Sequence, residues 1–538
     1  MASSIPKEFI EFLRKPESWP HGPERVEHIQ THISHVFIVS PYVYKFKKPL
    51  DLEFLDFSTL EKRKYYCERE VELNRRLCPE IYLGVVPVYR LHGSFSFEPP
   101  GEEDPEPFEY AVRMKQLNPE FFLKEFVRRG QLTTEHFDRV AKKLAGFYND
   151  QKPDESIRKW GSVNKIRENI EENFRQTEPF VGGTIDRETF QSIRSFNELA
   201  LEQLQTLFEK RIRENRIVDG HGDLHLEHIH LTENRLCIYD CIEFNDRFRY
   251  QDIAADIAFL AMDLDFNGLK NESDYFIERI SELLDDPDLL HLIDFYACYR
   301  AYVRGKVNSI ESDEEEVEPR ERRQAAELAR RYYSLSLNYA LIGGEPIVLL
   351  FMGRVASGKS TLAEQVAERL IAEHQSSDTA RKKWAGLPLS SRTPPKQRSD
   401  LYSKKMTDDV YSLLANRAIE AYKNKQNICL DATFGDPGRR RKLIETFDTA
   451  GVQYLFIETA ATDSTRIERL KKRETDDDTI SDARLEDLEK LDRNYSPPLE
   501  IDPGRLIRVG TDQPLDKTLT QLFQALIRNN LSSKSFDA

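Results

Sequence analysis

A short apolar stretch, a glycine-containing loop and an amphipathic helix follow one another in the C-terminal part of the chain. Residues 346–352 form a nearly continuous apolar run with β-branched side chains, which predicts a buried parallel strand. Leu362, Val366 and Leu370 recur four positions apart and predict a helix with one apolar face directly after the loop. This order is typical of an α/β domain with a parallel sheet.

The N-terminal part has a different pattern. Residues 1 to about 115 mix short strand signals with one clear helix over residues 59–77, and the following residues are largely helical. A strand–loop–strand block over residues 217–244 interrupts these helices, and residues 309–323 have almost no apolar content, which indicates an exposed connection into a charged helix. The segment Gly343-Gly-Glu-Pro346 indicates a break in regular structure, so we place a domain boundary near residue 341. The predicted regions are 1–115, 116–340 and 341–538.

Composition indicates a well-solvated globular protein with real cores: 39% of the 538 residues are hydrophobic and 32% are charged. The net charge of −15 argues against a nucleic-acid coat. Residues 381–445 are an exception, because they hold 15 Lys and Arg against 7 Asp and Glu. This stretch is either a solvated basic face or the docking region for a phosphorylated or polyanionic acceptor.

Membrane and secretion signals are not expected. No run of 18 apolar residues predicts a membrane span, and the N-terminus lacks a basic segment followed by an apolar one. The cysteines are scattered, so we expect buried free thiols in a reducing, cytoplasmic compartment. The six cysteines are Cys67, Cys78, Cys237, Cys241, Cys298 and Cys429.

The loop Gly353-Arg-Val-Ala-Ser-Gly-Lys-Ser360 is a complete phosphate-binding loop. Its glycines allow backbone N–H groups to surround phosphate oxygens at a helix N-terminus, Lys359 reaches the β- and γ-phosphates, and the Ser360 hydroxyl ligates magnesium. ATP and Mg²⁺ are therefore the expected cofactors. The predicted nucleotide-binding residues here are Gly353, Ser357, Gly358, Lys359, Ser360 and Thr361.

A second set of phosphate-directed residues lies in the N-terminal half. Asp223 stands in the His221-Gly-Asp-Leu-His225 segment, and Asp240 follows a short predicted hairpin. One carboxylate can take the proton of an acceptor hydroxyl while the other holds magnesium. Upstream, Lys45 lies on a predicted strand and Glu70 on a helix, the arrangement of a phosphate lysine and its partner.

On these residues, together with Asp252-Ile-Ala-Ala-Asp256, the segment from 25 to about 308 resembles the aminoglycoside phosphotransferase family, which has a two-lobed protein-kinase-like fold. The resemblance implies that Asp223 is the catalytic base and Asp240 a metal ligand. It also implies that Asp256 braces the catalytic loop.

Two features depart from that family pattern. His228 stands five residues after Asp223, where the family has an Asn that holds a second magnesium, and no glycine-rich loop precedes Lys45. An imidazole suits hard magnesium less well than an amide oxygen does. The clustered histidines also allow a zinc site, although their alternation along a strand favours opposite faces. These histidines are His221, His225, His228 and His230.

Residues 346 to about 525 resemble small P-loop kinases of the gluconate, shikimate and polynucleotide kinase type. That resemblance implies that Asp378 orients or deprotonates the acceptor hydroxyl and that Arg381 binds the acceptor, although Asp378 at the start of a helix is also explained as an N-cap. Asp431 ends the apolar run at 427–430 and is expected beside the magnesium ion, or else against the acceptor.

Three arginines, Arg466, Arg469 and Arg473, recur at spacings of three and four ahead of a polar turn at 475–482, in which Ser481 or Asp482 is expected to cap the next helix. They form either a solvated face or a lid over ATP, with Arg469 toward the nucleotide and Arg473 toward the transferred group. Arg300 and Arg304 share another helical face, as structural ion pairs or as ligands of an anionic acceptor.

Over nearly its full length the chain is similar to bacterial proteins that fuse an aminoglycoside phosphotransferase-like domain to an AAA-type kinase domain. We therefore predict an α+β bilobal protein-kinase-like domain followed by an α/β P-loop NTPase domain with a parallel sheet. The predicted function is a two-module ATP-dependent phosphotransferase that acts on small-molecule hydroxyls. The alternatives are a ligand-sensing pseudokinase that controls a P-loop kinase or ATPase, and a nucleic-acid end kinase in the C-terminal half.

Overall fold

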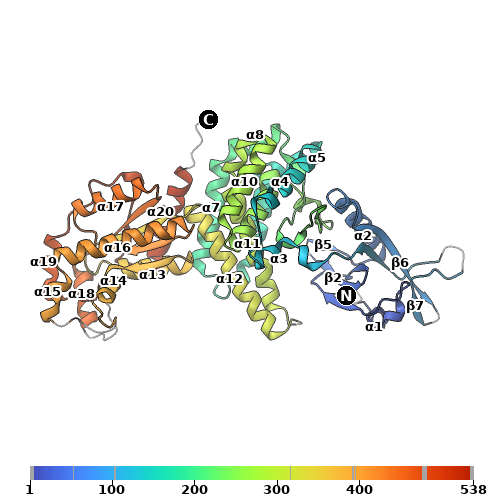
Figure 1. Ribbon diagram of the computed structural model, residues 1–538, viewed down its shortest axis with the longest axis horizontal. Helices are drawn as coiled ribbons and strands as arrows, with labels where there is room; N and C mark the ends of the chain where they lie inside the picture. The colour runs from blue at the N-terminus through green and yellow to red at the C-terminus, as the bar shows by residue number, and fades with distance from the viewer. Residues whose placement is uncertain are drawn as a thin grey trace. The chain divides into compact units, whose positions relative to one another are not determined.

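The computed structural model describes residues 5–52, 54–91, 93–101, 105–315, 317–389, 393, 395–474 and 481–533. The chain divides into two compact units, and each is described by itself below. The first unit comprises residues 1–168 and 205–296, and the second comprises residues 169–204 and 297–538. Figure 1 follows the chain by colour from the blue N-terminus to the red C-terminus. The three regions expected from the sequence stay predictions.

The first unit begins with an antiparallel sheet, whose strands lie in the blue part of the ribbon (Figure 1). Helix α2 (Leu60–Arg75) packs against β6 and β8, and Cys67 and Val71 bury one of its faces there. Helix α1 (Lys7–Leu13) inserts Phe9 into an aromatic core. The sheet order is β1 (Glu27–Gln30), β2 (Ser34–Val39), β3 (Tyr42–Lys47), β8 (Glu109–Lys115), β6 (Tyr82–Leu91) and β7 (Ser94–Ser96).

The rest of the first unit is mainly helical. Helix α9 (Ile253–Phe266) is apolar around most of its circumference and buried, and α10 (Lys270–Leu284) packs against both α9 and α4 (Thr134–Asn149). Two short antiparallel ladders interrupt the helices and present the loops that carry Asp223 and Asp240. These ladders pair β9 (Ile217–Asp219) with β12 (Tyr250–Asp252), and β10 (Ile229–Leu231) with β11 (Leu236–Ile238).

The second unit contains a five-stranded sheet in which every pairing is parallel. Its central strand is buried at each position, as the apolar run predicted, because parallel strands are covered on both faces. The sheet order is β14 (Glu373–Ser376), β15 (Ile428–Asp431), β13 (Val348–Gly353), β16 (Tyr454–Ala460) and β17 (Leu506–Gly510).

Helices surround this sheet and continue into a helical layer. Helix α12 packs against α7 and α20, and α20 also contacts β17. The helices that accompany the sheet are α13 (Lys359–Arg369), α14 (Ser377–Trp384), α16 (Lys404–Lys423), α17 (Pro437–Thr449) and α18 (Asp463–Glu474). The further helices of this layer are α7 (Arg187–Gln203), α11 (Ile293–Asp313), α12 (Pro319–Ile342) and α20 (Leu515–Ser533).

The parallel-sheet α/β fold predicted for the C-terminal part is confirmed. For the N-terminal part the structure has a mostly antiparallel sheet followed by helices, and the bilobal kinase-like fold stays a prediction. Over the described ranges, no helix combines the length and the apolar character that crossing a membrane requires.

Candidate functional sites

Lys45 on β3 lies between two acidic side chains of the first unit. Its Nζ is 3.0 Å from Glu70 Oε1 on α2 and 2.7 Å from Asp240 Oδ1 in the loop after β11. Burial disfavours the charge, but Asp240 and Glu70 outweigh it and hold the pKa of Lys45 well above its ordinary value. The structure thus brings together a strand lysine, a helix glutamate and a loop aspartate that the sequence named separately.

A second lysine belongs to this network, and sequence reasoning did not single it out. Lys47 is fully buried; its Nζ donates to Glu70 Oε2 over 2.7 Å and also contacts Glu243. Lys45 and Lys47 are two positions apart and therefore share one face of β3. The spacing of two was the signal in the sequence that could have identified Lys47. No signal in the sequence identified Glu243 as its partner.

The loop that carries Asp223 is held from behind by Asp256 of α9. The two Asp256 carboxylate oxygens accept the backbone N–H groups of His221 at 2.7 Å and Gly222 at 2.9 Å. Gly222 has φ of 87°, and a side chain there would meet the Phe248 carbonyl at 3.0 Å. Through these two hydrogen bonds Asp256 holds the loop in place, which is the role that the resemblance implied.

Four predicted histidines separate into two pairs. The rings of His225 and His228 are 3.9 Å apart beside Asp223, whose carboxylate is 3.4 Å from His225 Nε2 and 3.6 Å from His228 Nδ1. His221 and His230 instead approach the backbone carbonyls of Tyr239 and Asn118, at 2.9 Å and 3.1 Å. Four-histidine ligation is therefore not the arrangement in the structure.

Electrostatics place an ionised carboxyl beside a neutral imidazole in this cluster. Burial, followed by the neighbouring His225, lowers the pKa of His228 to about 4. For Asp240, burial opposes ionisation, but Lys45 and His228 overcome it and lower the pKa of the carboxyl. A neutral imidazole and an ionised carboxylate are both metal-binding forms, and His228 Nε2 is 3.5 Å from Asp240 Oδ2. His228 and Asp240 fit the predicted metal role.

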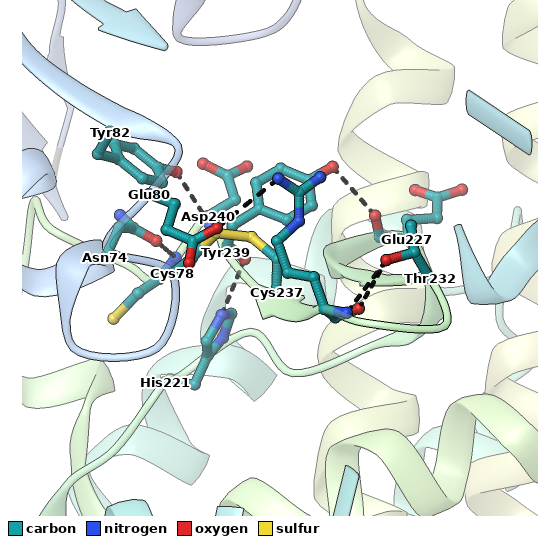
Figure 2. Close-up of a disulfide and its surroundings, with 12 residues drawn as sticks. Asn74, Cys78, Glu80, Tyr82, His221, Glu227, Thr232, Cys237, Tyr239 and Asp240 are labelled. Carbon is teal, nitrogen blue, oxygen red and sulfur yellow. Dashed lines mark hydrogen bonds and ion pairs between the residues drawn. A yellow bond between two sulfur atoms is a disulfide. The ribbon is translucent and has the colours of Figure 1, made fainter. Parts of the chain in front are cut away.

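A disulfide corrects the expectation that all six cysteines are free. Cys78, just after α2, is bonded to Cys237 of β11, with Cα atoms 4.9 Å apart. Figure 2 shows this bond beside Tyr82 and Asp240, and the Asp240 backbone N–H donates to Tyr82 Oη over 3.2 Å. The two cysteines are 159 positions apart, so no local pattern pointed to the pair. The free, buried cysteines are Cys67, Cys241, Cys298 and Cys429.

In the second unit, the phosphate-binding loop joins β13 to α13, which begins at Lys359. A side chain at Gly353 would lie 2.5 Å from the Thr459 carbonyl, so this position tolerates only glycine. Ser357 is buried, with its hydroxyl 2.6 Å from Thr459 Oγ1, so its side chain anchors the loop, and Thr361 is exposed. Lys359 and Ser360 are half-buried at the helix start.

Asp431 ends β15, the strand next to β13, and is 2% exposed. Burial raises the pKa of its carboxyl, against the opposing effects of Lys359 and of a hydrogen bond from Ser360. Among the described residues, Asp431 Oδ1 has no protein hydrogen-bond partner. A buried carboxylate oxygen of this kind beside a serine hydroxyl and a lysine fits a magnesium-nucleotide site.

The predicted acceptor residues lie beside Asp431. Asp378 is in the first turn of α14, whose N-cap is Ser376, and Arg381 Nη1 donates to Asp378 Oδ1 over 3.1 Å. Arg381 is almost fully buried, its guanidinium lies 4.5 Å from the centre of the Tyr402 ring, and its Nε has no partner among the described residues. Burial lowers the pKa of Arg473, against the opposing effects of Asp378 and Asp431. Because these two carboxylates act on Arg473, its guanidinium lies near them.

Arg466 and Arg469 of α18 contact the phosphate-binding loop. Arg466 Nε donates to the Val355 carbonyl over 2.9 Å, and Arg469 Nη1 donates to the Ala356 carbonyl over 3.2 Å. They brace the phosphate-binding loop, so Arg469 supports the nucleotide site from behind. Residues 475–480 of the predicted polar turn lie outside the described residues. Asp482 was expected as a possible helix cap, but it accepts the Thr393 N–H over 2.9 Å.

Two further predicted substrate residues, Arg300 and Arg304, lie on α11. The Arg300 guanidinium is 5.6 Å from the Tyr299 ring centre, and that of Arg304 is 5.5 Å from the Tyr332 ring centre. Arg300 is buried and Arg304 is half-buried, and binding of an anionic acceptor there stays a prediction.

Part of the basic stretch at 381–445 forms ion pairs within the protein. Acidic side chains pair with five of its arginines, and docking of a phosphorylated or polyanionic acceptor on this stretch stays a prediction. These pairs are Arg381–Asp378, Arg398–Asp487, Arg417–Glu373, Arg439–Asp408 and Arg440–Glu500.

Comparison with known proteins gives a family match for part of the chain and relatives that match most of its length. Residues 348–498 match the model of the AAA domain. "Uncharacterized protein Rv2004c" of Mycobacterium tuberculosis is 30% identical over 436 residues, which cover 79% of this chain and 82% of that protein. "Uncharacterized protein Mb2027c" of Mycobacterium bovis matches with the same identity and coverage.

Among solved structures, a gluconokinase from Sinorhizobium meliloti is similar at 20% identity and a TM-score of 0.27, over 36% of this chain and 98% of that one. The APS kinase CysC of Mycobacterium tuberculosis, in complex with AMPPNP and APS, is similar at 17% identity and a TM-score of 0.26, over 34% of this chain and 98% of that one.

Proposed function

The chain belongs to the same family as the mycobacterial protein Rv2004c, and we propose that it is an ATP-dependent phosphotransferase with a small-molecule hydroxyl acceptor at its P-loop site. The observation that carries this proposal is the convergence of Lys359, Ser360 and Asp431 with the Asp378–Arg381 pair. The Asp378–Arg381 pair, in which Arg381 is buried and Asp378 half-buried, supports an acceptor pocket.

The chemistry assigned to these residues is transfer of the γ-phosphoryl group. Lys359 and the backbone N–H groups of the loop hold the triphosphate, while Ser360 and Asp431 would hold Mg²⁺, which neutralises phosphate charge. Asp378 accepts the proton of the acceptor hydroxyl while the hydroxyl oxygen bonds to the γ-phosphorus. The bond between the γ-phosphorus and the β,γ-bridging oxygen breaks, which releases ADP. Arg473 stabilises charge on the transferred group.

For the N-terminal site we propose a second phosphotransfer centre in a bilobal, protein-kinase-like domain. Lys45, held by Glu70, would bind phosphate oxygens, and Asp240 with His228 would hold the metal ion. Asp223 would take the acceptor proton. The 2.7 Å Lys45–Asp240 contact supports this assignment, because it joins the lysine to the metal-binding carboxylate. The rival function, a ligand sensor without turnover, is favoured by the imidazole at position 228.

The test measures ATP consumption by full-length variants across a library of hydroxyl acceptors. Lys359→Ala is expected to abolish C-terminal turnover, and Asp223→Asn to abolish a separate activity with its own acceptor. Lys383→Ala, at an exposed position on α14, is the matched lysine control. If Asp223→Asn leaves every activity intact while Lys359→Ala removes all of them, the N-terminal site is a sensor. If acceptors never stimulate ATP consumption, the phosphotransferase proposal fails.

A further inference from the structure

His228 lies between two carboxylates of the N-terminal site. Its Nδ1 is 3.6 Å from Asp223 Oδ2, and its Nε2 is 3.5 Å from Asp240 Oδ2. Two donor atoms bound to one ion at about 2.1 Å each stand roughly 3–3.5 Å apart. The separation between Nε2 and Oδ2 therefore suits a shared divalent cation.

The hydrogen bonds of His228 fix which ring nitrogen is free for a metal. Its Nδ1 is 2.9 Å from the Asp223 backbone carbonyl, which can only accept, so Nδ1 carries the proton and Nε2 has a lone pair. Metal-binding histidines commonly donate their second ring N–H to a backbone carbonyl in this way, which orients the ring. On Asp240, Lys45 contacts Oδ1, and Oδ2 is the oxygen that faces His228.

The neighbouring His225 has the opposite tautomer. Its Nδ1 accepts the Glu227 backbone N–H at 3.4 Å, so Nε2 carries the proton and faces Asp223 Oδ2 at 3.4 Å. His225 therefore orients Asp223. The possible ligand atoms of Asp223, His225 and His228 all lie within 4.8 Å of one another. Because the His225 nitrogen that faces Asp223 carries a proton, the ring nitrogen that offers a lone pair to a metal ion is His228 Nε2.

We propose that the N-terminal site binds a divalent first-row transition ion, Mn²⁺ rather than Mg²⁺, through His228 Nε2 and Asp240 Oδ2. This inference rests on the nucleotide site proposed above, whose phosphate oxygens would supply further ligands. Mg²⁺ binds oxygen donors and keeps its water, whereas an imidazole nitrogen raises affinity for first-row transition ions. One nitrogen among several oxygens favours Mn²⁺ over Mg²⁺ more than an all-oxygen set does.

The experiment uses full-length protein carrying Asp431→Asn, so that the P-loop site contributes little metal binding. Mn²⁺ is titrated alone and with a non-hydrolysable ATP analogue, and bound ion is followed by electron paramagnetic resonance. Pulsed spectra report coupling to a ¹⁴N nucleus when an imidazole nitrogen ligates the ion. Mg²⁺ and Zn²⁺ are added as competitors. His228→Asn is compared with His230→Asn, whose ring contacts the Asn118 carbonyl instead.

The expected result is ¹⁴N coupling in the parent protein and in His230→Asn. In His228→Asn the coupling is lost, Mn²⁺ binding weakens by about tenfold or more, and the preference shifts toward Mg²⁺. The proposal is overturned if the coupling survives in His228→Asn, if Mg²⁺ displaces Mn²⁺ at equal concentration, or if Zn²⁺ binds without any need for Asp240. Nucleotide affinity in Mg²⁺, measured by calorimetry on the same proteins, separately reports whether the nucleotide site itself exists.

Discussion

Lys45 Nζ and Asp240 Oδ1 are 2.7 Å apart although 195 positions separate the two residues in the sequence. The contact joins a strand of the antiparallel sheet to the loop after β11, and Glu70 completes it from α2. Lys47, on the same strand face, binds Glu70 from the other side. One lysine of this pair therefore faces the proposed nucleotide site and the other is enclosed.

Replacing each lysine by methionine should separate binding from stability. In a Lys359→Ala background, Lys45→Met is expected to weaken nucleotide binding at the N-terminal site by at least about tenfold, because a charge-assisted phosphate contact is lost. Lys47→Met should instead lower the free energy of unfolding by about 3–5 kcal/mol, since it leaves the buried Glu243 carboxylate without its lysine and Glu70 with Lys45 alone. Calorimetry and urea unfolding measure the two effects. Equal losses of binding in both variants would contradict the division of roles.

Asp378→Asn should lower kcat of the C-terminal activity by about 10²- to 10⁴-fold with little change in KM for ATP, because it removes the proton acceptor and leaves the phosphate loop intact. Initial rates at saturating acceptor measure this. Asp400→Asn, at an exposed position on α15 (Pro395–Leu401), is the matched control. A change confined to KM for ATP would place Asp378 in nucleotide binding instead.

The Cys78–Cys237 disulfide should contribute to stability of the first unit. A dithiol reductant is expected to lower the unfolding free energy by about 2–5 kcal/mol, because the open chain regains conformational freedom. The double variant Cys78→Ser, Cys237→Ser should show the same loss and no further response to reductant. Thermal unfolding and intact mass under non-reducing conditions test this. Cys298→Ala, a free buried cysteine in the second unit, should keep the full response.

His35 should make the antiparallel sheet acid-sensitive. Burial first, then Lys48, His28 and Arg14, lowers its pKa from 6.5 to about 4. The unfolded chain therefore binds the proton more readily, so stability is complete above about pH 6.5 and falls as the pH drops toward 4. His35→Gln should recover about 1–2 kcal/mol of that loss in urea unfolding at pH 4.5, after allowance for solvent screening. His32→Gln, at an exposed position, should recover none.

Local signals in the sequence were enough for the P-loop module. The buried strand β13, the loop and α13 are consecutive, and Asp431 follows an apolar run that forms the neighbouring strand. The Lys45–Glu70 pairing was also accessible, but only through the resemblance to kinase-like proteins, whose pattern pairs a strand lysine with a helix glutamate.

Long-range partners were not accessible. Nothing near Cys78 indicates Cys237, and nothing near Lys47 indicates Glu243, because register between distant segments depends on tertiary packing. Arg469 illustrates a different difficulty. Its helical spacing pointed to the nucleotide side of α18, yet the guanidinium donates to the Ala356 carbonyl, a contact that sequence periodicity does not specify.

The phosphate-binding loop is tied down from outside its own sequence. Thr511 Oγ1 donates to the Ser357 carbonyl over 2.6 Å, the Ser357 hydroxyl meets Thr459, and Arg469 holds the Ala356 carbonyl. The loop thereby loses its freedom when the chain folds, before any ligand arrives. We therefore expect a triphosphate to bind with little further ordering of the loop backbone. Diffusion and charge, rather than rearrangement of the backbone, would then set the association rate.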